Sequence, residues 1–446
     1  MSVEAVKAIG AAFVDELALA GKTVVVGHDM RDSSAEFVAA FIEGVTARGA
    51  DAINIGLCST DECYFASGHL DAAAAMFTAS HNPASYNGIK LSRAGARGIS
   101  MDTGLAEILK RAEEYLKNGV SEVEEVGYSS NHQILGEYAS YLRQLVDLSG
   151  IKKLKVVIDA ANGMGGMTAP AVLGTEAGLS QLPIEIIPLY FELDGSFPNH
   201  EANPLDPKNL VDLQKAVVEN RADVGLAFDG DADRCFVIDE KGNPVSPSAV
   251  AAIVALSEIA RAKAAGEKDI VVLHNLLTSR AVAEFIEQAG AKPVRTRVGH
   301  SLIKDDMART GAIFGGEHSA HYYFKDFFGA DNGMLAAMHV LREFGSQPKP
   351  LSEFAKAFNP YFSSGEINSE VADAAAKVAQ IKAAFSQNSL DELDGITVSS
   401  GPGESPWWWF NVRSSNTEPL LRLNVEAESQ QSCDLLTQQL LGIIRC

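Results

Sequence analysis

Short apolar runs alternate with longer segments of helical periodicity along the first part of the chain. Buried strands separated by helices are typical of parallel sheets that are covered by helices, so this pattern predicts an α/β domain. The predicted elements are, in order, an amphipathic helix at 1–21, a strand at 22–29, a helix at about 34–48, a strand at 51–57, a helix through 63–68 and a strand at 73–79.

The same alternation restarts twice, at the apolar runs 153–163 and 269–275, without residue-level repeats. Two prolines within Gly345–Leu351 then break the helical pattern and indicate a linker. We therefore predict three consecutive α/β domains with mixed sheets, at 1–138, 139–243 and 244–350.

The last part of the chain, residues 351–446, has a different pattern and predicts a smaller α+β domain. The run Trp407–Phe410 is either an aromatic platform for a ligand or a strand that packs one face on the core, and strand alternation favours the core. The predicted elements are strands at 396–400, 407–415 and 419–428 and a helix from about 429 to 444.

Composition and charge narrow the function classes. The hydrophobic share of 46% and the charged share of 21% are ordinary for a globular protein, no apolar run has membrane-spanning length, and the start lacks signal-peptide features. The five cysteines are scattered, which argues against a disulfide framework or a structural zinc and favours a cytoplasmic enzyme. The formal charge of −21 disfavours nucleic acid and anionic membranes as partners. An anionic substrate would need a local cluster of Arg, Lys or backbone N–H donors.

A serine follows the last predicted strand of the first domain, in Thr78–Pro83. Carboxyl ends of parallel strands are where α/β folds place reacting groups, so Ser80 with its neighbour His81 is a candidate nucleophile. A polar turn, with Ser or Asn capping the next element, is the alternative. Lys90, one hairpin downstream, is a candidate base or phosphate partner.

Three carboxylates, Asp229, Asp231 and Asp233, follow an apolar strand of the second domain. They repel one another unless a cation lies among them, and all-oxygen ligation suits Mg²⁺. A solvated acidic turn is disfavoured because apolar strands flank the motif on both sides. An EF-hand is excluded, since Arg234 stands where that loop requires glycine and the flanking elements are strands. The motif therefore predicts a metal site, with Mg²⁺ preferred.

Two further loops carry side chains suited to a sugar phosphate. In Gly315–His321, Glu317 and Ser319 at alternate positions are candidates to bind vicinal hydroxyls, although a capped turn is equally consistent and the zinc-protease pattern is absent. In Arg413–Pro419, a guanidinium, hydroxyls, an amide and backbone N–H groups would form an oxyanion cradle. The alternative for this second loop is a hairpin turn anchored by the arginine.

Together, in this order and at this spacing, the four loops resemble the α-D-phosphohexomutase family, specifically its bacterial phosphomannomutase branch. The resemblance covers nearly the whole chain and implies a heart-shaped, four-domain protein with a central cleft and the fourth domain as a mobile lid. It implies interconversion of mannose 6-phosphate and mannose 1-phosphate through a phosphoserine and a hexose 1,6-bisphosphate, with Mg²⁺. The matching segments are TASHNPASYNGIKL, AFDGDADRCF, VGHSLIK, GGEHSAHYYF and RSSNTEPLLRLNVE.

The resemblance also implies a role for each matching position. The implied catalytic residues are Ser80 as phosphoserine, His81 and Lys90 in proton transfer, and Arg234 at the phosphoryl group. The implied metal ligands are phosphorylated Ser80, Asp229, Asp231 and Asp233. The implied substrate-binding residues are His300, Glu317, Ser319, His321, Arg413, Ser415, Asn416 and Thr417.

Two departures from the family pattern bear on activity. The family begins with a strand that carries a motif like Tyr-Asp-Ile-Arg-Gly, whereas this sequence starts at the following helix, which suggests a truncated start and puts its activity in doubt. In addition, Leu277 stands where relatives often carry a basic residue, and Arg280 is the candidate to replace it.

Other functions compete with the mutase hypothesis. A haloacid-dehalogenase-type phosphatase uses an Asp-x-Asp motif, but places it at the first strand, whereas here the acidic loop lies mid-chain and a separate serine loop is present. A truncated, non-catalytic sugar-phosphate binder is the third possibility. Phosphoglucomutase or dual activity is the alternative for the sugar, because Glu317 and Ser319 would contact hydroxyls that mannose and glucose share. The segment GGEHSAHYYF favours mannose, and the oligomeric state is not predicted.

Overall fold

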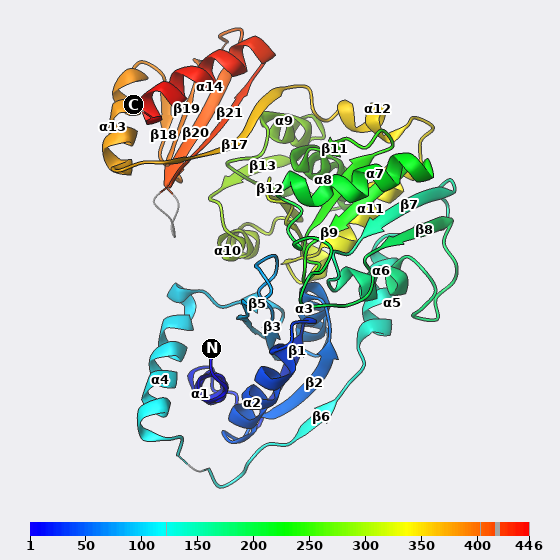
Figure 1. Cartoon of the computed structure of the whole chain (residues 1–446), viewed down its shortest axis with the longest axis vertical. Coiled ribbons are helices and arrows are strands. Elements are labelled where there is room, and N and C mark those ends of the chain that lie inside the picture. Colours follow the sequence, from blue (N-terminus) through cyan, green and yellow to red (C-terminus); the bar gives the residue numbers. More distant parts are fainter. Residues whose placement is uncertain (122, 402, 415–419, 446) are drawn as a thin grey trace.

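The computed structural model describes residues 1–121, 123–401, 403–414 and 420–445 and contains four sheets that follow one another along the chain. Figure 1 shows the first and fourth domains at opposite ends of the molecule, with the second and third packed together between them. The predicted class, three mixed α/β domains and a C-terminal α+β domain, is confirmed. No helix among the described residues is long and apolar enough to cross a membrane.

The first domain is a sheet of order β5-β4-β3-β1-β2-β6 with helices on both faces. One face packs on α1, α2 and α4 through alternate residues such as Val24 and Val26, and the other packs on α3 through Val25. Its elements are α1 (Val3–Glu16), β1 (Thr23–His28), α2 (Ser34–Thr46), β2 (Asp51–Leu57), α3 (Thr60–His69), β3 (Ala73–Phe77), β4 (Ile89–Arg93), β5 (Arg97–Gly98), the 3₁₀ turn η1 (Met101–Thr103), α4 (Leu105–Asn118) and β6 (Ser129–Asn131).

The second and third domains are sheets of order β11-β10-β9-β7-β8 and β13-β12-β14-β15-β16. The second comprises α5 (Leu135–Leu145), β7 (Leu154–Asp159), α6 (Gly165–Val172), β8 (Ile184–Leu189), η2 (Pro207–Leu210), α7 (Val211–Asn220), β9 (Val224–Phe228), β10 (Cys235–Asp239) and β11 (Pro244–Val245). The third comprises α8 (Pro247–Ala264), β12 (Val271–Asn275), α9 (Arg280–Gln288), β13 (Lys292–Thr296), α10 (His300–Thr310), β14 (Phe314–Gly316), β15 (Tyr322–Phe324), η3 (Lys325–Phe327), β16 (Ala330–Asp331) and α11 (Gly333–Gly345).

These three sheets share one topology. In each, a central strand (β1, β7 or β12) pairs in parallel with the next strand on one side and with a third strand on the other. The third strand then turns back through an antiparallel hairpin, β3–β4, β9–β10 or β14–β15. Each hairpin therefore lies at the carboxyl end of a parallel strand, where the sheet changes direction. The Ser80, Asp229 and Glu317 loops occupy these three equivalent positions.

The fourth domain is an antiparallel sheet of order β17-β21-β20-β19-β18, covered on one face by α13 and α14 around its own core. One continuous core instead runs through the first three domains and takes in Leu351 and Ala355 of α12, while α1, α2 and α4 pack in a second core on the other face of the first sheet. The fourth domain is thus the separate packing unit of the chain. The remaining elements are α12 (Leu351–Lys356), β17 (Phe362–Glu370), α13 (Ala374–Ala384), β18 (Ser389–Asp391), β19 (Ile396–Ser399), β20 (Trp408–Ser414), β21 (Leu420–Ala427) and α14 (Gln430–Arg445).

Candidate active site

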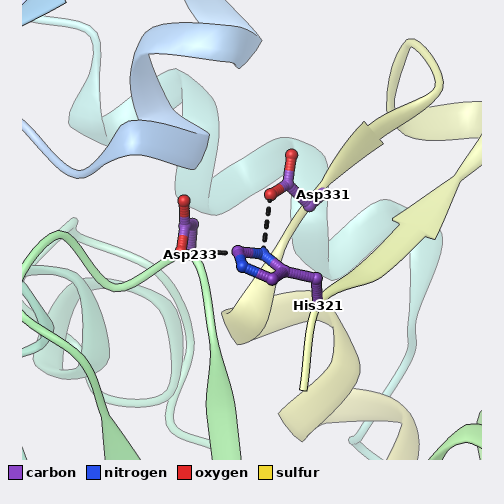
Figure 2. A group of neighbouring side chains, drawn as sticks. All are labelled: Asp233, His321 and Asp331. Atoms are coloured by element: carbon purple, nitrogen blue, oxygen red, sulfur yellow. Dashed lines mark hydrogen bonds and ion pairs between the residues drawn. The ribbon is translucent and has the colours of Figure 1, made fainter. Parts of the chain in front are cut away.

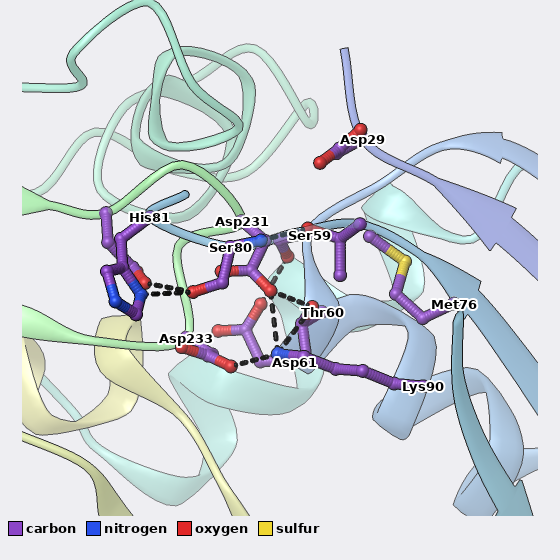
Figure 3. Close-up of polar contacts among 12 residues, drawn as sticks. Asp29, Ser59, Thr60, Asp61, Met76, Ser80, His81, Lys90, Asp231 and Asp233 are labelled. Carbon is purple, nitrogen blue, oxygen red and sulfur yellow. Dashed lines mark hydrogen bonds and ion pairs between the residues drawn. The ribbon is translucent and has the colours of Figure 1, made fainter. Parts of the chain in front are cut away.

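The candidate nucleophile, Ser80, lies in the β3–β4 hairpin and faces the second domain (Figure 3). Its hydroxyl donates to Asp229 Oδ2 at 2.9 Å and lies 3.3 Å from Nδ1 of His81. Its backbone N–H donates to Thr78 Oγ1 at 2.8 Å. The φ angle of Ser80 is +49°, a left-handed conformation that non-glycine residues keep only where the surroundings enforce it. The loop therefore holds one hydroxyl against the acidic loop of another domain.

The three predicted metal ligands converge in the β9–β10 hairpin. Asp229, Asp231 and Asp233 are each at most 1% exposed, and one ligand atom of each lies within 4.8 Å of the others. The Oδ1 atoms of Asp231 and Asp233 are buried without a hydrogen-bond partner in the described part of the chain. Because buried carboxylate oxygens without a hydrogen bond are costly, a cation that they ligate would stabilise the loop. This all-oxygen set fits Mg²⁺.

Two cations offset the charge of these carboxylates. Lys90 Nζ lies 2.8 Å from Asp231 Oδ2 and 2.7 Å from Asp233 Oδ2, and Arg234 Nε donates to Asp229 at 2.9 Å. Burial opposes the charge of Lys90, but the two carboxylates outweigh it and raise the pKa of Lys90 well above its usual value. Burial raises the pKa of Asp229 to about 7, against the opposing effect of Arg234. Lys90 is thus an ammonium at neutral pH, held inside the acidic loop.

Arg234 and His81 complete the surroundings of the Ser80 hydroxyl. An Arg234 NH2 group donates to Ser80 Oγ at 3.3 Å and to His81 Nδ1 at 2.5 Å. Burial, followed by the nearby Arg234 charge, lowers the pKa of His81 to about 4. His81 is therefore a neutral imidazole at pH 7, whose Nδ1 accepts from Arg234 and lies beside the serine oxygen.

Thr60 belongs to this site although the sequence did not indicate it. Its hydroxyl donates to Asp231 Oδ2 at 2.5 Å and its backbone N–H donates to the Asp231 carbonyl at 2.9 Å (Figure 3). Thr60 is the first residue of α3 and is fully buried. Only the polar run Ser59–Glu62 after β2 could have drawn attention to it, and nothing in that run indicates a partner 171 positions away.

Three hydrogen bonds hold the carboxylate of Glu317 in the third-domain loop. Its Oε1 accepts from Asn275 Nδ2 at 3.2 Å and from the Gly299 N–H at 3.3 Å, and its Oε2 accepts from the Tyr323 hydroxyl at 2.7 Å. Ser319 is half-buried two residues further on. The His300 side chain lies outside the described residues, although α10 begins at this position. Glu317 is thus positioned by its own domain.

His321 connects this loop with the metal loop (Figure 2). Its Nδ1 is 3.0 Å from Asp331 Oδ2 and 3.9 Å from Asp233 Oδ1, and Lys304 Nζ lies 2.7 Å from Asp331 Oδ1. Burial opposes protonation of His321, but Asp233 and Asp331 raise its pKa. Because a lysine ammonium already neutralises Asp331, we interpret the cluster as an ion network rather than as a second metal site.

The fourth-domain loop is described only at its start. Arg413 NH2 lies 3.1 Å from Glu366 Oε2, while the Arg413 Nε is buried without a hydrogen-bond partner among the described residues. The other predicted members of the cradle, Ser415, Asn416 and Thr417, lie outside the described residues. An unpaired guanidinium donor is suited to an incoming anion.

The Trp407–Phe410 run packs partly on the core, as strand alternation predicts, and partly along a cavity; its use as a ligand platform stays a hypothesis. Trp408 and Phe410 pack with Phe385 in the core of the fourth domain. Trp407 and Trp409 line a cavity of about 740 Å³ between the third and fourth domains.

Arg280 lies at the same junction, 4.6 Å from the centre of the Trp407 ring, and Arg280 Nε lies 2.7 Å from Glu284 Oε1. Leu277, the position where we expected a basic residue from the resemblance, lies three residues before the start of α9. That Arg280 replaces this basic residue stays a prediction.

Comparisons with known proteins agree along the whole chain. The family models for phosphoglucomutase/phosphomannomutase match in succession: α/β/α domain I at residues 1–118, domain II at 136–242, domain III at 246–361 and the C-terminal domain at 366–442. A phosphohexose mutase of Xanthomonas campestris pv. campestris is 39% identical over 427 residues, covering 95% of this chain and 91% of that protein. A phosphomannomutase of Salmonella typhimurium is 39% identical over 414 residues, covering 91% and 87%. The crystal structure of a phosphoglucomutase/phosphomannomutase family protein from Burkholderia thailandensis superposes with a TM-score of 0.85 at 27% identity, covering 100% of this chain and 94% of that one.

Proposed function

The chain belongs to the phosphoglucomutase/phosphomannomutase family and is an intramolecular phosphotransferase of the phosphomannomutase or phosphoglucomutase type, and we propose that it works through a phosphorylated Ser80. Within the family we propose mannose 6-phosphate and mannose 1-phosphate as the preferred pair. The relatives act on hexose phosphates, and the acidic loop is suited to the Mg²⁺ that the family uses.

One observation carries the proposal. The Ser80 hydroxyl, from the first domain, is 2.9 Å from Asp229 Oδ2, in a second-domain loop that has two buried carboxylate oxygens without hydrogen-bond partners. The candidate nucleophilic oxygen and the proposed cation position are thereby adjacent, an arrangement suited to phosphoryl transfer. A polar turn would not need a left-handed serine against a buried triple carboxylate.

Each residue of the site would have its own role in the phosphoryl transfer. Asp229, Asp231 and Asp233 would hold Mg²⁺, which would supply positive charge near the transferring phosphoryl group. In the first half-reaction the Ser80 O–P bond breaks as a hexose hydroxyl oxygen bonds to phosphorus, and the proton of that hydroxyl ends on the Ser80 oxygen. Arg234, which donates to His81 Nδ1 here, would contact the phosphoryl oxygens instead, and the nitrogen thereby freed on the neutral His81 would carry the proton between the two oxygens. Lys90, protonated between two carboxylates, would act as a charge partner.

The substrate would be held in two orientations. The first transfer makes a hexose 1,6-bisphosphate, which turns over in the cleft so that Ser80 takes back the other phosphate. Glu317 and Ser319, with His300 and His321 nearby in the third domain, would contact the sugar in both poses. Arg413 with Ser415, Asn416 and Thr417 would bind the phosphate that is not reacting.

Replacing Arg413 with Ala tests this last assignment. Because a charge-assisted contact to the distal phosphate is lost in ground state and transition state alike, the Michaelis constant for the hexose phosphate should rise on the order of 10- to 100-fold with kcat little changed. Arg422→Ala is the control in the same steady-state assay. Arg422 pairs in register with Arg413, and its NH1 group lies 3.5 Å from Oε1 of the same Glu366. An effect confined to kcat would contradict the assignment.

A coupled assay with mannose 1-phosphate and glucose 1-phosphate tests the reaction and the sugar. We expect the 6-phosphates as products, with the higher kcat/KM for mannose 1-phosphate. Equal values would establish dual specificity, and release of free phosphate would support a phosphatase instead. Running the assay on this chain and on one extended upstream also shows whether a preceding strand contributes to activity.

A further inference from the structure

Arg31 makes four hydrogen bonds to the backbone of the loop that carries Ser80. From the segment after β1, its NH1 group donates to the carbonyls of Pro83 and Tyr86 at 2.8 and 2.9 Å. Its NH2 group donates to the carbonyls of Ser80 and Asn82 at 2.8 and 2.7 Å. One guanidinium thus satisfies four backbone carbonyls within seven residues of the hairpin. Neither its position nor its neighbours in the sequence indicated this role.

The guanidinium is itself held from two sides. Arg31 Nε donates to Asp29 Oδ2 at 3.1 Å, and both side chains are at most 1% exposed. Asp29 is in turn bound by the Ser34 hydroxyl at 2.9 Å. On the second-domain side, the Phe197 ring lies 5.2 Å from the guanidinium carbon. Arg31 therefore connects the end of β1, the serine loop and the second domain.

The hydrogen bond from Arg31 to the Ser80 carbonyl bears on the direction of the reacting hydroxyl. Ser80 has the disfavoured positive φ of 49°, so its hydroxyl keeps its direction only while its own peptide is held. Its N–H is held by Thr78 and its carbonyl by Arg31. Gly230, between two of the metal-loop aspartates, leaves room for that carbonyl, because a Cβ there would lie 2.5 Å from it.

We propose, resting on the phosphoserine function assigned to Ser80, that Arg31 is the positioning residue that sets the direction of the Ser80 hydroxyl toward the acidic loop. Arg31 does not touch the reacting atoms; it acts through the backbone of the loop. Removing it should let the peptide relax toward ordinary φ values and turn the hydroxyl away from Asp229. Phosphoryl transfer should then slow, while binding of the hexose phosphate by the third and fourth domains is retained.

The substitution Arg31→Lys tests this, because it keeps the charge but presents a single ammonium in place of the planar fork that reaches four carbonyls. We expect kcat, and the rate at which Ser80 takes phosphate from glucose 1,6-bisphosphate, to fall together on the order of 100-fold, with KM changed by less than about 3-fold. The rate of phosphorylation is followed by intact mass and the fold by thermal melting.

Arg143→Lys is the matched control. Arg143 likewise donates to three backbone carbonyls, those of Val172, Gly174 and Ser180, but in a segment of the second domain remote from Ser80 in the chain. Its variant should melt at a lowered temperature similar to that of Arg31→Lys and keep kcat within about 3-fold of the wild type. A folded Arg31→Lys protein with wild-type kcat, or an equal loss of kcat in Arg143→Lys, would overturn the proposal.

If Arg31→Lys does not fold, Phe197→Leu weakens the same anchor from the second domain. The loss of one cation–π contact should then lower kcat about 5-fold at unchanged KM, and an unchanged kcat would overturn the proposal. Measurements on the wild-type protein distinguish a failure of the proposed function from a failure of the role proposed for Arg31. A wild type that takes no phosphate on Ser80 refutes the proposed function, whereas a phosphorylated wild type with fully active anchor variants refutes only the role of Arg31.

Discussion

Replacing Ser80 with Ala is expected to reduce mutase turnover by at least on the order of 10⁴-fold, because the variant has no oxygen that can carry the phosphoryl group. The fold should survive. The lost hydroxyl makes a hydrogen bond to Asp229, worth about 1 kcal/mol, and that carboxylate keeps its contact with Arg234. The coupled mutase assay and thermal melting measure the two effects separately.

Ser85→Ala is the matched control for this prediction. Ser85 lies in the same hairpin and is exposed, so the same chemical change there should leave both turnover and melting temperature near those of the wild type. Retained activity in a folded Ser80→Ala protein would contradict the phosphoserine role, regardless of the result for Ser85→Ala.

Replacing Asp231 with Asn is expected to have the second-largest effect, a loss of kcat on the order of 10³-fold at a fixed Mg²⁺ concentration. The Asp231 Oδ1 atom is buried without a hydrogen-bond partner in the described residues, while Oδ2 is taken up by Thr60 and Lys90. The amide weakens the metal site by one charge. A readout independent of activity is the rise in melting temperature that Mg²⁺ produces in the wild type through preferential binding to the folded state, which should disappear in the variant.

Asp212→Asn is the control for the second prediction. It removes the same charge from the same domain at an exposed position, where the carboxylate accepts from the Tyr190 hydroxyl. Mg²⁺ should stabilise this variant as it does the wild type. A Mg²⁺-dependent rise that persists in Asp231→Asn would show that the cation binds elsewhere.

Much of the fold could be predicted because its signals are local. The three α/β units have short apolar strands separated by periodic helices, and these indicated the three units and their order along the chain. The fourth domain was predicted less completely. Its edge strand β17, with the sequence FSSGEINSE, has mostly exposed or half-buried positions and therefore no apolar alternation. Its pairing with β21 depends on the neighbouring strand rather than on its own sequence.

The site likewise contains residues that the sequence indicates and residues that only the structure shows. Ser80 and the three aspartates stand in contiguous motifs whose chemistry is legible in the residue types, and the structure brings them together across two domains. Thr60 and Arg31 act on groups distant in the sequence and carry no local motif, so that only the packing of α3 and of the segment after β1 shows their roles.

The most direct test of the central claim is the intact mass of the purified chain after incubation with glucose 1,6-bisphosphate and Mg²⁺, followed by peptide mapping. We expect the added mass of one phosphoryl group, located on Ser80, and its loss when a hexose monophosphate is added in excess. A chain that turns over mannose 1-phosphate while Ser80 carries no phosphate under any of these conditions would contradict the phosphoserine mechanism.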